Sequence, residues 1–224
     1  MRAQLTDRKT GLVYAFWSTI NKIAIALHFR KVEVEGREFI PTDGPYLLIS
    51  NHTSRWDGLL AYHLINRPAN FMVSPNELLG LQGHVLGSMG SFPANPRFDL
   101  VAHMQRQVKK GEPIVIFPEG DTYRDGATHR FKNGAARFAL SSITQGLEFP
   151  VIPMAVRYSE DGRQVSIKLS APIDIKQYAG THQLEAIQAL TARMQREVSY
   201  LKYELGHQED VAVLFAGDPP KWAA

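Results

Sequence analysis

A histidine and a carboxylate stand five positions apart, directly after an apolar run. Residues 46–50 predict a buried strand, and His52 and Asp57 follow it. A neutral imidazole can accept a proton from a hydroxyl, and a neighbouring carboxylate can fix its tautomer and stabilise the imidazolium. On a regular helix the two side chains would diverge by roughly 140°. We therefore expect His52 in a turn, with Thr53 or Ser54 capping a helix that brings Asp57 beneath the ring. Alone, the pair is more typical of a structural histidine at a strand end beside a surface aspartate.

A second apolar run, residues 113–118, ends in a turn that contains Glu119 and Gly120. Two apolar strands that are both followed by polar turns indicate parallel neighbours whose carboxyl ends face the same way. In open α/β sheets this edge is where ligands bind. The two turns are therefore expected to form one site.

Four segments in this order resemble the glycerolipid acyltransferase family, which includes 1-acyl-glycerol-3-phosphate acyltransferase. Asn51, His52 and Asp57 match its Asn-His-x4-Asp signature, and residues 117–120 match Phe-Pro-Glu-Gly without change. Residues 131–134 resemble its Phe-Lys-x-Gly segment, and residues 151–156 resemble its apolar strand with an internal proline. A lone His-x4-Asp pattern is weak evidence, whereas four elements in order are specific.

The resemblance implies transfer of a fatty acyl group from a thioester to the hydroxyl of a lysolipid, such as lysophosphatidic acid. The thioester would be acyl-CoA or an acyl-carrier protein, used as co-substrate, and no cofactor is implied. In this interpretation His52 is the general base and Asp57 orients it. The remaining expected site residues bind substrate or stabilise the oxyanion, and they are Arg97, Glu119, Gly120, Arg124 and Lys132.

The departures from the family pattern lie among the residues expected to bind the acceptor. Thr122 stands where the family usually has arginine, and Arg97 comes about one residue later than the usual arginine of the second signature. The lysine that often precedes Glu77 is replaced by the segment 74–76. Fewer cations in the acceptor pocket leave room for an acceptor less charged than lysophosphatidic acid.

Composition fits one globular α/β domain, residues 31–206, with a central mostly parallel or mixed sheet flanked by helices. The 224 residues are 44% hydrophobic and 21% charged, which is ordinary for a folded domain. A net charge of +3 favours an anionic membrane surface, but the dispersed basic residues show no nucleic-acid fingerprint. Because the chain has no cysteine, disulfides, thiolate metal sites and a covalent cysteine mechanism are excluded.

Residues 1–30 predict an N-terminal amphipathic helix at a membrane interface. The run from Gly11 to Phe29 is apolar but interrupted by Asn21 and Lys22, which argues against a signal peptide. A central lysine costs roughly 2.5–3.5 kcal/mol on insertion scales, so a spanning helix is marginal. An interfacial helix flanked by cations fits better, and a helix packed into the core is the alternative. We expect a peripheral enzyme that binds membrane lipids at the cytoplasmic face.

The remaining pattern alternates strands and helices, and residues 207–224 are expected to form a surface tail. Expected strands are residues 31–36, half exposed, 71–73, and 164–169 at a sheet edge. Expected helices are residues 58–64, 98–110 with Gly111 as cap, 134–140, and an amphipathic helix at 181–205.

Two other function classes stay open. A metallohydrolase could use His52, Asp57 and Glu119 as ligands, with His63 or His84 added, although no ligand spacing matches a known motif and our interpretation includes no metal site. A non-catalytic lipid-binding module of the same fold is the other alternative, and retention of both catalytic residues argues against it.

Overall fold

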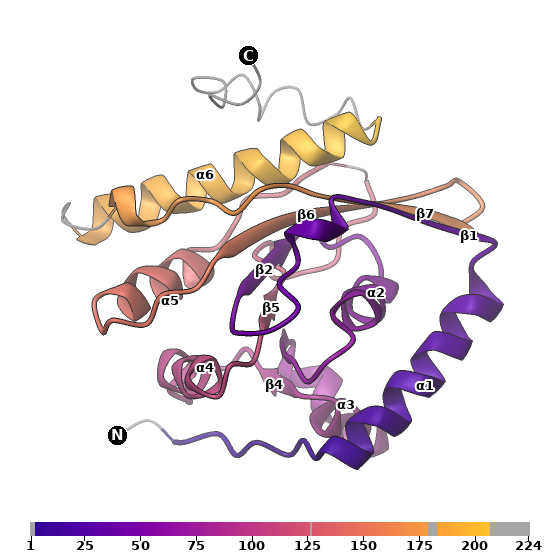
Figure 1. The fold of residues 1–224 in the computed structure, drawn as a ribbon, viewed down its shortest axis with the longest axis horizontal. Helices are drawn as coiled ribbons and strands as arrows, with labels where there is room; N and C mark the ends of the chain where they lie inside the picture. The colour runs from indigo at the N-terminus through magenta and orange to yellow at the C-terminus, as the bar shows by residue number, and fades with distance from the viewer. Residues whose placement is uncertain (1–2, 126, 179–182, 207–224) are drawn as a thin grey trace.

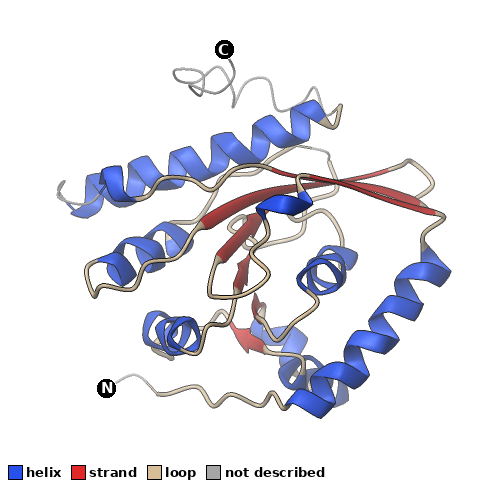
Figure 2. Ribbon diagram, in the orientation of Figure 1, coloured by secondary structure: helices blue, strands red, loops and turns tan. Residues whose placement is uncertain are grey.

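A seven-stranded mixed sheet organises the chain, in a computed structural model that describes residues 3–125, 127–178 and 183–206 (Figures 1 and 2). The strand order is β1-β7-β6-β2-β5-β3-β4, and every pairing is parallel except that of β6 with β7. The strands are β1 (Lys31–Glu35), β2 (Leu47–Ser50), β3 (Asn70–Val73), β4 (Ser91–Pro93), β5 (Ile114–Ile116), β6 (Val151–Tyr158) and β7 (Gln164–Leu169). This architecture confirms the expected α/β class with a mixed central sheet.

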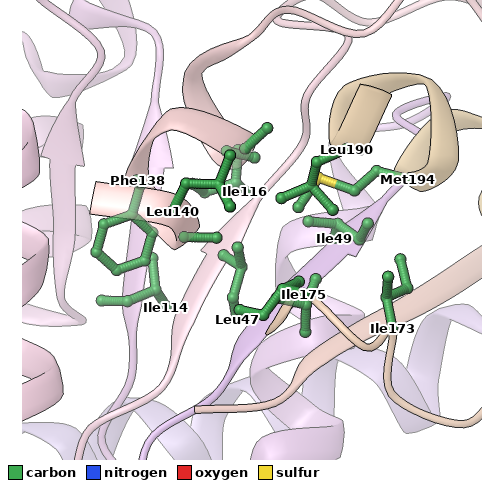
Figure 3. Close-up of a cluster of buried hydrophobic side chains, with 14 of the residues drawn as sticks. Leu47, Ile49, Ile114, Ile116, Phe138, Leu140, Ile173, Ile175, Leu190 and Met194 are labelled. Carbon is green, nitrogen blue, oxygen red and sulfur yellow. The ribbon is translucent and has the colours of Figure 1, made fainter. Parts of the chain in front are cut away.

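Helices cover both faces of the sheet, as Figure 1 shows, with α4, α5 and α6 on one side and α1, α2 and α3 on the other. They are α1 (Gly11–His28), α2 (Trp56–Ile65), α3 (Gly80–Ser88), α4 (Leu100–Lys109), α5 (Gly134–Ile143) and α6 (Gln183–Glu204). Because strand side chains alternate between faces, Leu47 and Ile49 of β2 enter the core under α5 and α6, whereas Leu48 enters the other core (Figure 3). Two covered faces explain why β2 and β5 are continuous apolar runs.

Most expected elements are confirmed, and one strand was placed wrongly. Residues 164–169 form β7, which pairs with β1 on one side and β6 on the other, so it is internal rather than an edge strand. Its alternating pattern reports that one face is more deeply covered than the other, which says nothing about how many neighbours the strand has. The expected surface tail, residues 207–224, lies outside the described residues.

The N-terminal helix α1 packs its more polar side inward and leaves an apolar stripe outside. Its buried residues are Tyr14, Ser18, Asn21 and Ile25. The Asn21 amide donates to the Leu59 carbonyl at 2.9 Å, which ties α1 to α2. The stripe, exposed by between 40% and 89%, consists of Leu12, Phe16, Ile20, Ile23 and Leu27. The helix therefore contacts the core, as the alternative expected, while presenting an apolar surface outward.

No helix among the described residues combines the length and apolar character that crossing a bilayer requires.

Candidate active site

His52 and Asp57 form a hydrogen-bonded pair at the carboxyl end of β2. Nδ1 of His52 lies 2.9 Å from Oδ2 of Asp57. Asp57 is fully buried, and the His52 side chain is 22% exposed. Since a carboxylate oxygen accepts, Nδ1 carries the proton and Nε2 holds the lone pair. Within the described part of the chain Nε2 makes no hydrogen bond, so it is free to act as a base.

The residues on either side of His52 hold it at the strand exit. Asn51, fully buried, donates from Nδ2 to the Val156 carbonyl at 3.0 Å and accepts from the Val156 N–H at 2.8 Å. Its side chain thereby continues the pairing of β2 with β6 after β2 has ended at Ser50. As expected, His52 lies between β2 and α2. The expected cap was wrong: Arg55 is the N-cap of α2 and makes no side-chain cap hydrogen bond, while the Ser54 hydroxyl, one residue earlier, accepts from the N–H of Trp56 at 3.2 Å.

Asp57 is held through both carboxylate oxygens. Oδ2 accepts from the backbone N–H groups of Thr53 at 2.7 Å and Ser54 at 2.8 Å, in addition to His52. Oδ1 accepts from the Tyr158 hydroxyl at 2.5 Å. Burial, and after it the negative charge of Asp57, raises the pKa of Tyr158 above its ordinary value. These donors replace the water that a buried carboxylate loses, and the first turn of α2 adds a favourable dipole.

The turn after β5 lies beside His52, as its parallel pairing with β2 predicted. The Phe117 ring stacks on the imidazole with centroids 4.5 Å apart. Gly120 adopts φ +70°, a backbone conformation that favours glycine, and a Cβ there would stand 2.3 Å from Nζ of Lys132, so the lysine side chain would have to move. Nζ of Lys132 donates to the Gly120 carbonyl at 3.3 Å. Glu119, which precedes Gly120 in the same turn, is buried.

A cavity of about 470 Å³ opens next to this turn. Its lining residues are Glu119, Tyr123, His129, Arg130, Phe131, Lys132 and Asn133. The N–H of Tyr123 donates to the His52 carbonyl at 2.9 Å, which places the cavity beside the base. The Tyr123 ring stacks on His129, whose Nε2 lies 2.8 Å from a carboxylate oxygen of Asp125. The cavity thus offers cations and an aromatic surface.

Of the expected substrate-binding residues, Glu119, Gly120 and Lys132 are brought next to His52, and Arg97 is not. Arg124 is exposed and directly follows Tyr123, a lining residue of the cavity, in the chain. Arg97 is exposed on the segment after β4, at the far end of the sheet. Three strand spacings separate β4 from β2, which is roughly 14 Å.

The ligands that a metallohydrolase would need do not gather. In the ranges that the structure describes, no three His, Asp or Glu side chains come together in a way that could hold a metal ion. His63 and His84 lie on α2 and α3, and burial lowers the pKa of His63.

Comparison with known proteins decides the family. The family model described as Acyltransferase matches residues 31–157, more than half of the chain and all of its His-Asp pair. The chain belongs to the acyltransferase family. Lys132 and the turn after β5 also lie inside the matched range, whereas α1 precedes it and Tyr158 stands one residue beyond it.

Two named acyltransferases are similar to this chain over part of their length. A chloroplastic 1-acyl-sn-glycerol-3-phosphate acyltransferase of Brassica napus is 31% identical over 140 residues, covering 57% of this chain and 38% of that protein. A 1-acyl-sn-glycerol-3-phosphate acyltransferase of Borreliella burgdorferi is 30% identical over 129 residues, covering 55% and 52%. The chain therefore spans about two fifths to half the length of these relatives.

A solved structure shares the acyltransferase fold. The 1-acyl-sn-glycerophosphate acyltransferase of Thermotoga maritima superposes with a TM-score of 0.58 at 23% identity, covering 83% of this chain and 79% of that one. At this identity the likeness concerns the fold.

Sequence reasoning missed three residues of the candidate site. Tyr158, Phe117 and the amide of Asn51 were not assigned roles, although Asn51 and Phe117 lie inside quoted motifs. The position of Tyr158 carried a usable signal, because a tyrosine at the carboxyl end of a strand parallel to β2 can reach the same edge of the sheet.

Proposed function

We propose that this chain transfers an acyl group from a thioester to the hydroxyl of a lysolipid, with His52 as general base. The observation that carries the proposal is the 2.9 Å contact between Nδ1 of His52 and a fully buried Asp57. A cavity lies nearby, because Tyr123, which lines it, donates from its backbone N–H to the His52 carbonyl. A base so arranged contributes roughly 10²–10⁴-fold to a rate.

The reaction needs one proton to move twice. Nε2 of His52 takes the proton of the acceptor hydroxyl while its oxygen attacks the thioester carbonyl carbon. Asp57 stabilises the imidazolium that forms. When the tetrahedral intermediate collapses, the C–S bond breaks, and the departing sulfur takes the proton back from Nε2. The products are an ester and a free thiol, and the base is regenerated.

Lys132 is the candidate donor to the oxyanion. The backbone N–H of Gly120, which the sequence also suggested, already donates to the Phe117 carbonyl at 3.0 Å within its turn. The ammonium of Lys132 has three protons, of which one faces the Gly120 carbonyl. Stabilisation of this kind is commonly worth a factor of about 10² or more.

Lysophosphatidic acid is the acceptor we favour, and acyl-CoA or an acyl-carrier protein is the proposed donor. The names of the relatives specify 1-acyl-sn-glycerol-3-phosphate as acceptor, and the cavity is lined by Arg130 and Lys132, with Arg124 exposed next to Tyr123 in the chain. These cations would compensate for Thr122 at the family's usual arginine position, since phosphate binding depends on charge-assisted hydrogen bonds.

The test is an acceptor screen with one labelled acyl-CoA and one labelled acyl-carrier protein, with thiol release as a second readout. Lysophosphatidic acid, zwitterionic lysolipids and glycolipid lysolipids are compared. We expect acylation of lysophosphatidic acid and at least a 10²-fold loss in His52→Ala. His84→Ala, which removes an exposed histidine of α3, is the matched control and should retain activity. Full turnover in a folded His52→Ala protein would refute the mechanism.

We further propose that the outer stripe of α1 binds a membrane surface from its cytoplasmic side. Five large apolar side chains on one face of α1 are exposed rather than packed in the core, and Lys22 lies exposed on the same helix. The exposed Leu79 and Leu81, before and at the start of α3, add apolar surface of the same kind. The lysolipid acceptor would then reach the site from the bilayer.

Binding to vesicles of anionic phospholipid tests this proposal. The double variant Phe16→Ser/Ile23→Ser should lose most vesicle binding, while its melting temperature should stay within about 2 °C because both side chains are exposed. The matched control Phe16→Leu/Ile23→Leu keeps the surface apolar and should bind. Equal binding by both double variants would show that the stripe is not the contact.

A further inference from the structure

Tyr158 contacts the Asp57 carboxylate from the end of β6, two residues beyond the apolar segment 151–156 that resembles the family motif. It is the last residue of β6, and its hydroxyl donates to Oδ1 of Asp57 at 2.5 Å. We propose that Tyr158 is a positioning residue, which locks the Asp57 carboxylate so that Oδ2 stays aimed at Nδ1 of His52. The inference rests on the proposed role of His52 as the base and assigns a further member to that site.

The need for a second anchor follows from how the carboxylate is bonded. All the contacts from the His52 turn, namely the imidazole and the N–H groups of Thr53 and Ser54, converge on Oδ2. Rotation about the bond between Cβ and the carboxyl carbon would exchange the two oxygens or tilt Oδ2 out of the imidazole plane. A donor at Oδ1, approaching from β6, opposes that rotation. It also satisfies an oxygen that is removed from water, because Asp57 has no exposed surface.

The phenol also controls where the proton of the pair resides. Because burial and the neighbouring carboxylate raise its pKa, the phenol stays protonated and remains a donor at any working pH. A hydrogen bond donated to Oδ1 withdraws electron density from the carboxylate and lowers its proton affinity. The Nδ1 proton then stays on the imidazole, which keeps the lone pair on Nε2.

Packing aims the phenol ring. The ring of Phe29, which directly follows α1, lies 6.1 Å from the ring of Tyr158 and 5.3 Å from that of Trp56 at the start of α2. Other charged or titratable groups on the elements that pack beside the pair are Glu119 and Lys132 after β5, Arg55 and His63 at α2, and His28, which stacks on Trp56. Tyr158 is the one tyrosine among the described residues whose hydroxyl bonds to the pair.

Tyr158→Phe removes the hydroxyl and keeps the ring, and Tyr62→Phe is its matched control. Tyr62 is also buried, on α2, and its hydroxyl donates to the backbone carbonyl of Tyr14 at 3.1 Å, away from the site. Both variants lose one hydrogen bond, and the melting temperature should fall in both, further in Tyr158→Phe because that hydroxyl donates to a charged carboxylate. A purely structural role for Tyr158 would leave every other property alike in the two proteins.

The distinguishing measurements are the pH dependence of kcat and the NMR titration of the His52 imidazole in the substrate-free enzyme. Without the phenol, Asp57 is more basic. Because the N–H groups of Thr53 and Ser54 still hold Oδ2 near the ring, the carboxylate then stabilises the imidazolium more, so the imidazole pKa rises. We expect the acidic limb of kcat and the NMR midpoint to move up by about 0.5–1 pH unit in Tyr158→Phe. The kcat itself should fall about 5- to 50-fold with little change in KM, and Tyr62→Phe should match wild type in all three.

The NMR result separates this inference from the proposed function. An upward shift of the His52 midpoint in a wild-type protein that acylates no acceptor would sustain the positioning role and refute the acyltransfer assignment. A His52 midpoint identical in wild type, Tyr158→Phe and Tyr62→Phe would overturn the positioning role, whatever the activity.

Discussion

Asp57→Asn tests how much of the rate depends on the buried negative charge rather than on geometry. Asparagine keeps the shape of the side chain, and its amide oxygen can still accept from Nδ1 of His52 and from the two backbone N–H groups that converge on Oδ2. Its NH2 group would face the Tyr158 hydroxyl, whose oxygen can accept as well as donate. The packing of the site is therefore retained while the charge is lost.

The magnitude follows from the separation of the charges. With Nδ1 and Oδ2 2.9 Å apart, the centres of the imidazolium and carboxylate charges lie roughly 4 Å apart. At an effective dielectric constant of about 20 this attraction is worth about 4 kcal/mol. Since each 1.36 kcal/mol is a factor of ten, loss of the full term would reduce kcat by about 10³-fold. The hydrogen bond that asparagine retains preserves part of this stabilisation, so we expect kcat to fall by about 10²- to 10³-fold.

The assay is thiol release from acyl-CoA in the presence of the acceptor that the screen identifies, run beside circular dichroism to confirm folding. Asp161→Asn is the matched control, because Asp161 is an exposed carboxylate in the turn between β6 and β7 and contacts Ser159 and Arg163 rather than the site. A folded Asp57→Asn enzyme within tenfold of wild type would refute the view that Asp57 stabilises a developing imidazolium.

The other predictions concern acid stability and the acceptor. Burial, followed by the cations Arg106 and Lys9, lowers the pKa of His103 to about 4. The unfolded chain, with a pKa near 6.5, then binds more protons between these values. The contribution of His103 to the free energy of unfolding is fully present above about pH 6.5, and it falls by up to about 3 kcal/mol as the pH drops to 4. As the pH drops through this window, the urea midpoint of the wild type should fall relative to that of His103→Leu. A constant difference between the two midpoints would contradict the assignment. Arg124→Ala should raise the KM for a phosphate-bearing acceptor by about 10- to 100-fold. Arg97→Ala should change it far less, because β4 lies three strand spacings from β2; equal effects in acceptor kinetics would show that the acceptor extends toward β4.

Several features of this protein were determined by local sequence alone. Residues 46–49 before His52 and residues 113–118 before Glu119 are continuous apolar runs, which marks strands covered on both faces, and they proved to contain the parallel neighbours β2 and β5. The spacing of His52 and Asp57 excluded a continuous helix, and the turn between them is present. Such features follow from the spacing of apolar side chains and from backbone preferences over a few residues. Both can be recognised without knowing which other segments the residues pack against.

Tertiary structure decided which distant residues complete the site. Tyr158 reaches Asp57 from 101 positions away, because β6 pairs with β2 and ends at the same edge of the sheet. Strand order also moved Arg97 away from His52 and made β7 internal, since periodicity reports how a strand is covered and not which strands pair with it. For α1, the sequence showed apolar residues around much of the helix, and packing chose which of them face the core. The polar Ser18 and Asn21 lie inward because the backbone carbonyl of Leu59 offers Asn21 a partner, which leaves the larger apolar side chains outside.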